Sequence, residues 1–139
     1  MTSILFLCTG NSCRSQMAEG WLRHFHPEIQ AFSAGIVAHG KNPLAIKAMA
    51  SAGVDISNQE SQTTDELPLE EVDYVFTVCD NAAESCPVFP ARAKIIHAPF
   101  DDPPKLAKDA ATEEEALVHY ERVRDDVKQF VQDIKQHLS

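Results

Sequence analysis

The sequence has no long apolar run and no excess of basic residues. Its 12 lysine and arginine residues are outnumbered by 21 acidic residues, which gives a formal net charge of −9 at pH 7. Nucleic-acid surfaces need clustered cations to neutralise phosphates, so this balance argues against nucleic-acid binding. The first residues lead into a strand-like segment without a basic leader, a cleavage site or a membrane-length apolar stretch. We therefore expect a cytoplasmic protein with no membrane partner.

The sequence also lacks internal repeats, linkers and low-complexity tracts, and it has only four cysteines. With 139 residues and 44% apolar content, residues 1–139 can bury one core as a single domain. In a reducing cytosol, the cysteines are more consistent with catalysis, redox cycling or burial than with permanent disulfides. Neither the cysteines nor the six histidines show the spacing of a metal site, so no metal is expected.

Apolar periodicity predicts alternating strands and helices. Short apolar segments predict strands at residues 4–7, 30–34, 74–78 and 94–98, and helical spacing predicts helices at residues 16–25, 44–52 and 112–138. Asn42 and Pro43 form a helix start, Gly53 ends that helix, and Thr112 with Glu115 forms a capping box. This order predicts an α/β fold, a doubly wound sheet of about four parallel strands with helices on both faces.

A polar loop joins the first predicted strand to the first predicted helix. A strand, a tight loop and a helix N-terminus aim backbone N–H groups at an anion, and no Walker motif accompanies them. We expect an oxyanion smaller than a nucleotide, bound by Thr9, Gly10, Asn11, Ser12, Cys13, Arg14 and Ser15.

Cys8 and Arg14 flank this loop and give it a chemistry. The helix N-terminus and the Arg14 guanidinium both favour a thiolate, so Cys8 is predicted to be a nucleophile near neutral pH. The planar guanidinium can hold two oxygens of a tetrahedral anion over the sulfur. A buried cysteine and a surface arginine at a chance spacing is the alternative interpretation.

Cys79 and Cys86 supply two further thiols. Cys79 follows the third predicted strand as Cys8 follows the first, so a parallel sheet brings both to one edge. If residues 80–86 are helical, Cys79 and Cys86 are separated by roughly 10 Å, beyond disulfide reach. A disulfide between them then requires this segment to unwind. Two ordinary core cysteines are the alternative.

Asp102 is the candidate general acid. It follows the fourth predicted strand, and Pro103 holds it extended, so its carboxyl can point at the loop.

Residues 8–19 resemble the low-molecular-weight tyrosine phosphatase superfamily, and specifically its thioredoxin-coupled arsenate reductase branch. Cys79, Cys86 and Pro87 match the relay-cysteine segment of that branch. Several shorter motifs also match the branch: Ser33-Ala34-Gly35, His39-Gly40, Asn42-Pro43 and Asp55-Ile56-Ser57-Asn58. Pro104 stands where the phosphatases typically carry an aromatic residue that grips the substrate ring, which favours a small inorganic substrate.

The resemblance implies a reaction and its partners. Cys8 attacks arsenate, a Cys8–Cys79 disulfide forms as arsenite leaves, a Cys79–Cys86 disulfide follows, and thioredoxin reduces it. Phosphate and sulfate act as substrate analogues. Asn11 is implied to hold a left-handed turn, and the Ser15 hydroxyl is implied to support the Cys8 thiolate. No bound cofactor is expected.

Some family members hold a structural potassium ion with residues that match Asn11, Glu19 and Ser33, together with a threonine and an aspartate. The last two positions here are Glu60 and Gln62, which argues against the ion in this chain.

Two other functions remain open from the sequence. A tyrosine phosphatase would need only Cys8, Arg14 and Asp102, which leaves Cys79 and Cys86 unexplained. A non-catalytic thiol sensor of redox state or oxyanions would use the same disulfide switch without turnover.

Overall fold

The fold is a four-stranded parallel sheet covered by helices. The computed structural model describes residues 2–79 and 93–138 of the chain. The strands are β1 (Ser3–Cys8), β2 (Gln30–Gly35), β3 (Tyr74–Thr77) and β4 (Lys94–His97), in the order β2-β1-β3-β4. All neighbouring strands pair in parallel, so the predicted α/β sheet is confirmed. The central strands β1 and β3 are buried along their whole length, as expected for apolar strands inside a parallel sheet.

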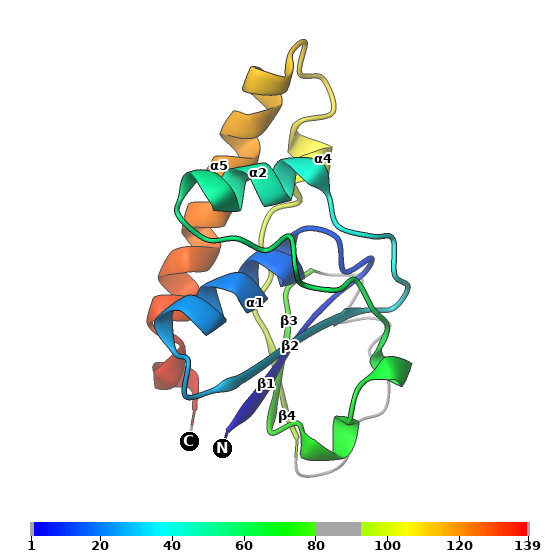
Figure 1. Ribbon diagram of the computed structural model, residues 1–139, viewed down its shortest axis with the longest axis vertical. Coiled ribbons are helices and arrows are strands. Elements are labelled where there is room, and N and C mark those ends of the chain that lie inside the picture. Colours follow the sequence, from blue (N-terminus) through cyan, green and yellow to red (C-terminus); the bar gives the residue numbers. More distant parts are fainter. Residues whose placement is uncertain (1, 80–92, 139) are drawn as a thin grey trace.

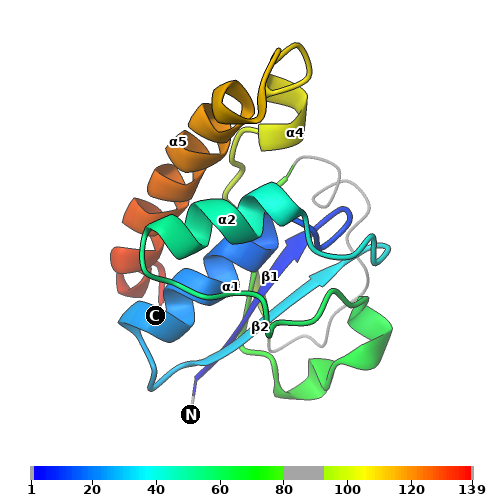
Figure 2. The same ribbon diagram turned by 45° about the horizontal axis from the view of Figure 1, so that its top comes forward.

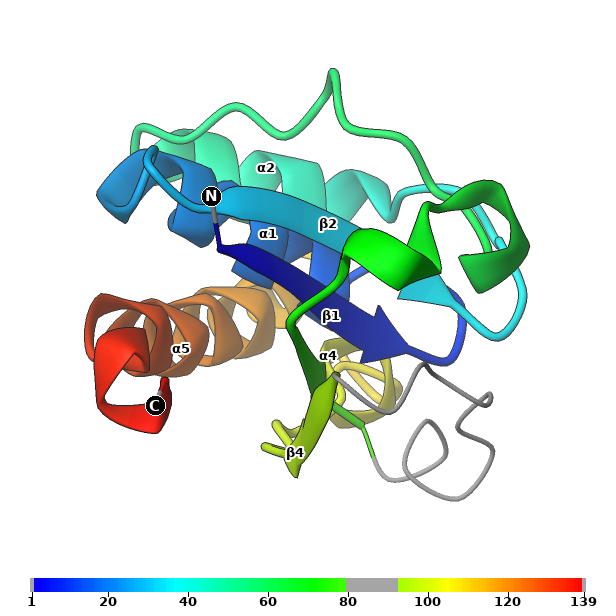
Figure 3. The same cartoon turned by 90° about the horizontal axis from the view of Figure 1, so that it is seen from below.

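The long helices pack on one face of this sheet. They are α1 (Arg14–Phe25), α2 (Pro43–Ser51) and α5 (Glu113–Gln132), with a short α4 (Pro103–Leu106) near the start of α5. In Figures 1 and 3, α1 and α5 lie together against the sheet, and Figure 2 shows α2 alongside α1. The described part of the opposite face carries two 3-10 turns, η1 (Thr64–Glu66) and η2 (Leu69–Glu71), which the sequence did not predict.

The predicted N-caps of α2 and α5 are confirmed, whereas α1 begins at Arg14, two residues before its predicted start, and α5 ends before its predicted end. Asn42 accepts a hydrogen bond from Leu44 N at 2.9 Å, and Pro43 is the first residue of α2. Thr112 accepts from Glu115 N at 3.1 Å, but the Glu115 carboxylate accepts from Ala111 N, so only half of the predicted capping box forms. The last α-helix ends at Gln132 rather than at residue 138, and a 3-10 turn η3 (Ile134–His137) follows.

The core is formed where α1 and α5 pack against the sheet. Its largest fully buried side chains include Trp21, Phe6 and Phe76. Trp21 also donates from its indole to the carbonyl of Arg124 at 3.1 Å, which joins α1 to α5. No helix in the described ranges is long and apolar enough to cross a membrane.

The carboxyl edge of the sheet gathers the residues of interest. β1 ends at Cys8 and β2 at Gly35, which are register partners. Val78 N, just after β3, donates to Leu7 O at 2.9 Å, so Cys79 emerges beside the end of β1. Parallel strands therefore bring segments far apart in the sequence to one edge, where ligands of such sheets bind.

Candidate functional site

The loop between β1 and α1 adopts a strained tight turn around Asn11. Asn11 has a φ of 49°, in the left-handed region, as the family resemblance implied. The loop also lies directly against the end of β2, because a Cβ added to Gly35 would lie 2.8 Å from both Asn11 N and Thr9 O. Only glycine allows that approach.

The carbonyl groups of the loop point outward to the segment that connects β2 with α2. Donors from residues 36–42 bond four of them: Ile36 N to Cys8 O, Val37 N to Thr9 O, His39 N to Gly10 O and Asn42 N to Ser12 O, at 2.8–3.2 Å. Across a trans peptide, the N–H of the next residue points away from such a carbonyl. The N–H groups that follow these carbonyls belong to Thr9, Gly10, Asn11 and Cys13. They therefore point away from the connecting segment, toward the inner side of the loop, where they can bind an anion.

The side chain of Asn11 fixes the loop from within. Its Nδ2 donates to Ser15 Oγ at 2.8 Å and to Ser33 Oγ at 3.0 Å. Its Oδ1 accepts from Gln62 N at 2.8 Å and from Gln16 Nε2 at 3.1 Å. Asn11 is fully buried, so these bonds satisfy a polar group that would otherwise destabilise the fold.

Arg14 begins α1 and lies at the rim of the loop with 13% of its side chain exposed. Its Nη1 donates to Phe100 O at 3.0 Å, and its Nη2 lies 3.9 Å from Asp102 Oδ2. Its Nε is buried and has no hydrogen-bond partner in the described residues. A buried guanidinium nitrogen without a partner is costly, and an oxyanion in the loop would satisfy it.

Cys8 and Cys79 lie in contact beneath the loop, as the parallel topology predicted. Both are almost fully buried, and Thr9 Oγ1 lies 3.2 Å from Cys79 Sγ. A hydrogen bond with Cys79 raises the pKa of Cys8, and burial raises it further. The Arg14 guanidinium and the N–H of Thr9 lower this pKa but do not outweigh the other two effects.

The neighbouring thiol and burial therefore act against the thiolate that the sequence predicts for Cys8, while Arg14 and the loop N–H act in its favour. The sequence analysis considered the helix N-terminus and Arg14 but not the neighbouring thiol or the loss of solvent.

Cys13 lies inside the loop and is also buried. Loss of solvent raises the pKa of Cys13 to about 12, although Arg14 acts in the opposite direction. Burial therefore favours the thiol form of Cys13 over the thiolate.

Asp102 lies across the site from the loop and is 40% exposed at its side chain. Its backbone is extended (φ −88°, ψ 107°) just before Pro103, as predicted. A cavity of about 460 Å³ opens beside it and is lined by Arg14, Phe100, Asp101, Asp102, Lys105 and Leu106. The carboxyl group thus faces the space next to the guanidinium.

The structure brings together Cys8, Arg14, Cys79 and Asp102, together with the loop residues between Cys8 and Arg14. Cys86 and the predicted helix before it lie outside the described residues. Sequence reasoning missed the support behind the loop, namely Gln16, Gln62 and Tyr120. Tyr120 of α5 accepts from Asn42 Nδ2 at 2.9 Å, and Asn42 bonds the loop at Ser12. The Asn42-Pro43 motif was the available signal, although its pattern reads equally as a helix start.

This arrangement suits an α/β enzyme that handles tetrahedral oxyanions through a cysteine. The chain belongs to the low molecular weight phosphotyrosine protein phosphatase family, whose family model matches residues 3–139.

Curated relatives and solved structures refine this placement. An arsenate reductase of Bacillus licheniformis is 52% identical over 126 residues, which cover 90% of this chain and 88% of the relative. An arsenate reductase of Bacillus subtilis is 51% identical over 125 residues, which cover 89% of this chain and 88% of the relative. A solved arsenate reductase in the phosphate-binding state matches with a TM-score of 0.76 and 28% identity over 100% of both chains. A tyrosine phosphatase of Erwinia amylovora shares the fold, with a TM-score of 0.77 and 22% identity over 99% of this chain and 93% of the other.

Proposed function

We propose that this protein is an arsenate reductase that reduces arsenate to arsenite through Cys8, Cys79 and Cys86, with thioredoxin as the external reductant. The observation that carries the proposal is the contact of two buried thiols, Cys8 and Cys79, at the base of an oxyanion loop. Hydrolysis of a phosphate ester needs one thiol, whereas reduction of arsenate needs a second thiol within reach of the first. The arsenate reductases among the relatives support the same substrate.

The first step forms a sulfur–arsenic bond. Arsenate takes the loop's inward N–H groups and the unbonded Arg14 Nε, which places arsenic over the Cys8 sulfur. Cys8 attacks arsenic, and one arsenate oxygen leaves as water. The two protons of that water come from the Cys8 thiol and from Asp102. Arsenic stays in the +5 state. Ser15 accepts a hydrogen bond from Asn11 at 2.8 Å, so its own proton is left to support the sulfur of Cys8.

The second step moves two electrons to arsenic. The sulfur of Cys79 attacks the sulfur of Cys8, the sulfur–arsenic bond breaks toward arsenic, and arsenite departs as a Cys8–Cys79 disulfide forms. Cys86 then attacks Cys79 and releases the Cys8 thiol, which leaves a Cys79–Cys86 disulfide for thioredoxin. Two thiols are oxidised for each arsenate reduced.

The phosphatase is the second candidate, because Arg14 and Asp102 line one cavity, Cys8 lies at the start of the same loop, and hydrolysis requires no other thiol. We expect it only as a side activity, since Pro104 stands where the phosphatases typically carry an aromatic residue that grips the substrate ring, and Lys105 and Leu106 follow it at the wall of the cavity beside Arg14.

Turnover with arsenate, thioredoxin, thioredoxin reductase and NADPH tests the proposal. Sustained NADPH consumption that depends on arsenate is the expected result. A phosphatase would hydrolyse p-nitrophenyl phosphate without consuming reductant. A thiol sensor would consume one equivalent and stop, and either of these outcomes would refute the reductase.

A further inference from the structure

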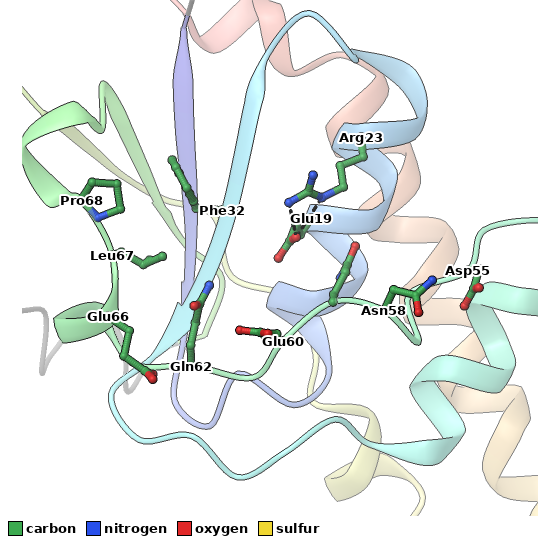
Figure 4. Close-up of a pocket in the computed structure, with 11 residues that line it drawn as sticks. Glu19, Arg23, Phe32, Asp55, Asn58, Glu60, Gln62, Glu66, Leu67 and Pro68 are labelled. Carbon is green, nitrogen blue, oxygen red and sulfur yellow. Dashed lines mark hydrogen bonds and ion pairs between the residues drawn. The ribbon is translucent and has the colours of Figure 1, made fainter.

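A buried carboxylate is linked to the oxyanion loop through Ser33 and Asn11. Glu19 of α1 has only 5% of its side chain exposed, and its Oε2 lies 2.8 Å from Arg23 Nη2 and 2.9 Å from Arg23 Nε. Figure 4 shows this Arg23–Glu19 pair at the wall of a cavity of about 620 Å³. Arg23 also donates from Nη2 to Ala31 O of β2 at 3.1 Å, which ties the guanidinium to the sheet.

The Arg23–Glu19 pair connects directly to the loop. Ser33 Oγ donates to Glu19 Oε1 at 2.5 Å, and Asn11 Nδ2 donates to Ser33 Oγ at 3.0 Å. Asn11 is the residue whose left-handed backbone shapes the loop, and it also bonds Ser15. A continuous chain of charge-assisted and neutral hydrogen bonds therefore leads from the guanidinium to the loop.

The same residues include the family's potassium ligands, and their arrangement does not fit the ion. The backbone N–H of Gln62 bonds Asn11 Oδ1 and thereby turns the Nδ2 donor, not an oxygen, toward Ser33. One oxygen of Glu19 accepts from Ser33 and the other faces the Arg23 guanidinium. A hard cation needs several oxygens with free lone pairs, and here those oxygens are bonded to hydrogen-bond donors.

We propose that Arg23 is a positioning residue for the oxyanion loop, and that its guanidinium supplies to Glu19 the positive charge that a bound potassium ion would otherwise bring. With this charge in place, Glu19 accepts from Ser33, Ser33 orients the Asn11 amide, and the loop keeps the turn that directs its N–H groups inward. The inference rests on the proposed function only in that the loop binds a tetrahedral oxyanion.

Phosphate affinity tests the proposal without arsenate turnover, so failure of the reductase assay would not affect it. Inorganic phosphate is titrated calorimetrically into the reduced full-length chain, well below the melting temperature of each variant. For Arg23→Gln we expect phosphate binding weakened roughly three- to tenfold, because the buried carboxylate loses its counter-charge and the chain loosens. Arg23→Lys should recover most of the phosphate affinity, because lysine keeps the positive charge. The recovery should be incomplete, because lysine lacks the two-nitrogen contact with Glu19.

Lys47→Gln is the matched control, because Lys47 is a cation of similar exposure (57% against 58%) that pairs with Glu113 away from the loop. It should bind phosphate as the wild type does. The wild type should also bind phosphate equally well in potassium, sodium or N-methylglucamine chloride at one ionic strength. An unchanged affinity in Arg23→Gln, or a wild type that binds phosphate tightly only in potassium, would overturn the proposal; the second result needs no variant to fold.

Discussion

The oxyanion loop and the turn that carries Asp102 lie at the same edge of the sheet, yet they are held in different ways. The loop is bonded through its backbone to residues 36–42 and through the Asn11 side chain to Ser33 and Gln62, and Cys8 is 4% exposed. The acid turn has backbone bonds from Phe100 N to Val78 O and from Leu106 N to Asp102 O. Its side-chain contacts come from Arg14 and Arg122, and Asp102 is 40% exposed. The nucleophile is therefore preorganised, whereas the acid is held by contacts that solvent weakens.

This difference predicts the largest loss at Cys8. Cys8→Ser removes the thiol proposed to attack an anion in the loop, so arsenate reduction and phosphatase activity should both fall at least about 10³-fold. Both activities are measured on one preparation, with phosphate binding as the check that the loop is intact. Retention of either activity would show that the chemistry begins elsewhere.

A smaller loss is expected at Asp102. Asp102→Asn keeps the shape but cannot protonate a departing oxygen, so kcat should fall about 10²-fold with little change in phosphate affinity. Asp101→Asn is the matched control, because its carboxylate pairs with Arg122 at 2.8 Å on an exposed surface, and a loss below about threefold is expected. Equal losses in the two variants would remove Asp102 from the chemistry.

The contact between the thiols predicts a pH effect. Cys79 raises the pKa of Cys8, so the wild type should react slowly with iodoacetamide at neutral pH and faster as the pH rises. Cys79→Ala removes the hydrogen bond, so its rate curve should shift to lower pH. Peptide mapping assigns the label to Cys8, and Cys86→Ser, which keeps Cys79, serves as the control. A curve that stays in place in Cys79→Ala would mean that the hydrogen bond does not govern Cys8.

The smallest effect is expected in the support behind the loop. Tyr120→Phe removes the hydroxyl that accepts from Asn42 at 2.9 Å, so the free energy of unfolding should fall by about 1 kcal/mol. Phosphate affinity should change less than in Arg23→Gln, because four backbone bonds still hold the loop. Urea unfolding measures the stability, and no change in it would mean that this hydrogen bond contributes nothing net.

Much of the fold and the centre of the site followed from the sequence. The apolar segments before Cys8 and Cys79 predict parallel strands, and parallel strands must bring both thiols to one edge, which the structure bears out. The Asn42 and Thr112 caps are local signals that tertiary contacts left intact.

Other features depend on contacts that no local pattern specifies. The pKa of Cys8 is raised by Cys79, a neighbour 71 positions away in the sequence. The sequence of α1 likewise does not indicate that the Glu19 side chain is buried and paired with Arg23. The two 3-10 turns between α2 and β3 lack the apolar periodicity that identifies longer elements, so they were missed.

The central claim is that the Cys8 and Cys79 thiols give two electrons to arsenic and form a disulfide. One measurement tests this claim most directly. Cys86→Ser is reacted with arsenate for a single turnover without thioredoxin, the free thiols are blocked in acid, and the disulfides are mapped by mass spectrometry. We predict one equivalent of arsenite and a Cys8–Cys79 disulfide, because the first two steps need no third thiol. Arsenite release without that disulfide, or repeated turnover of Cys86→Ser once thioredoxin is added, would contradict the account.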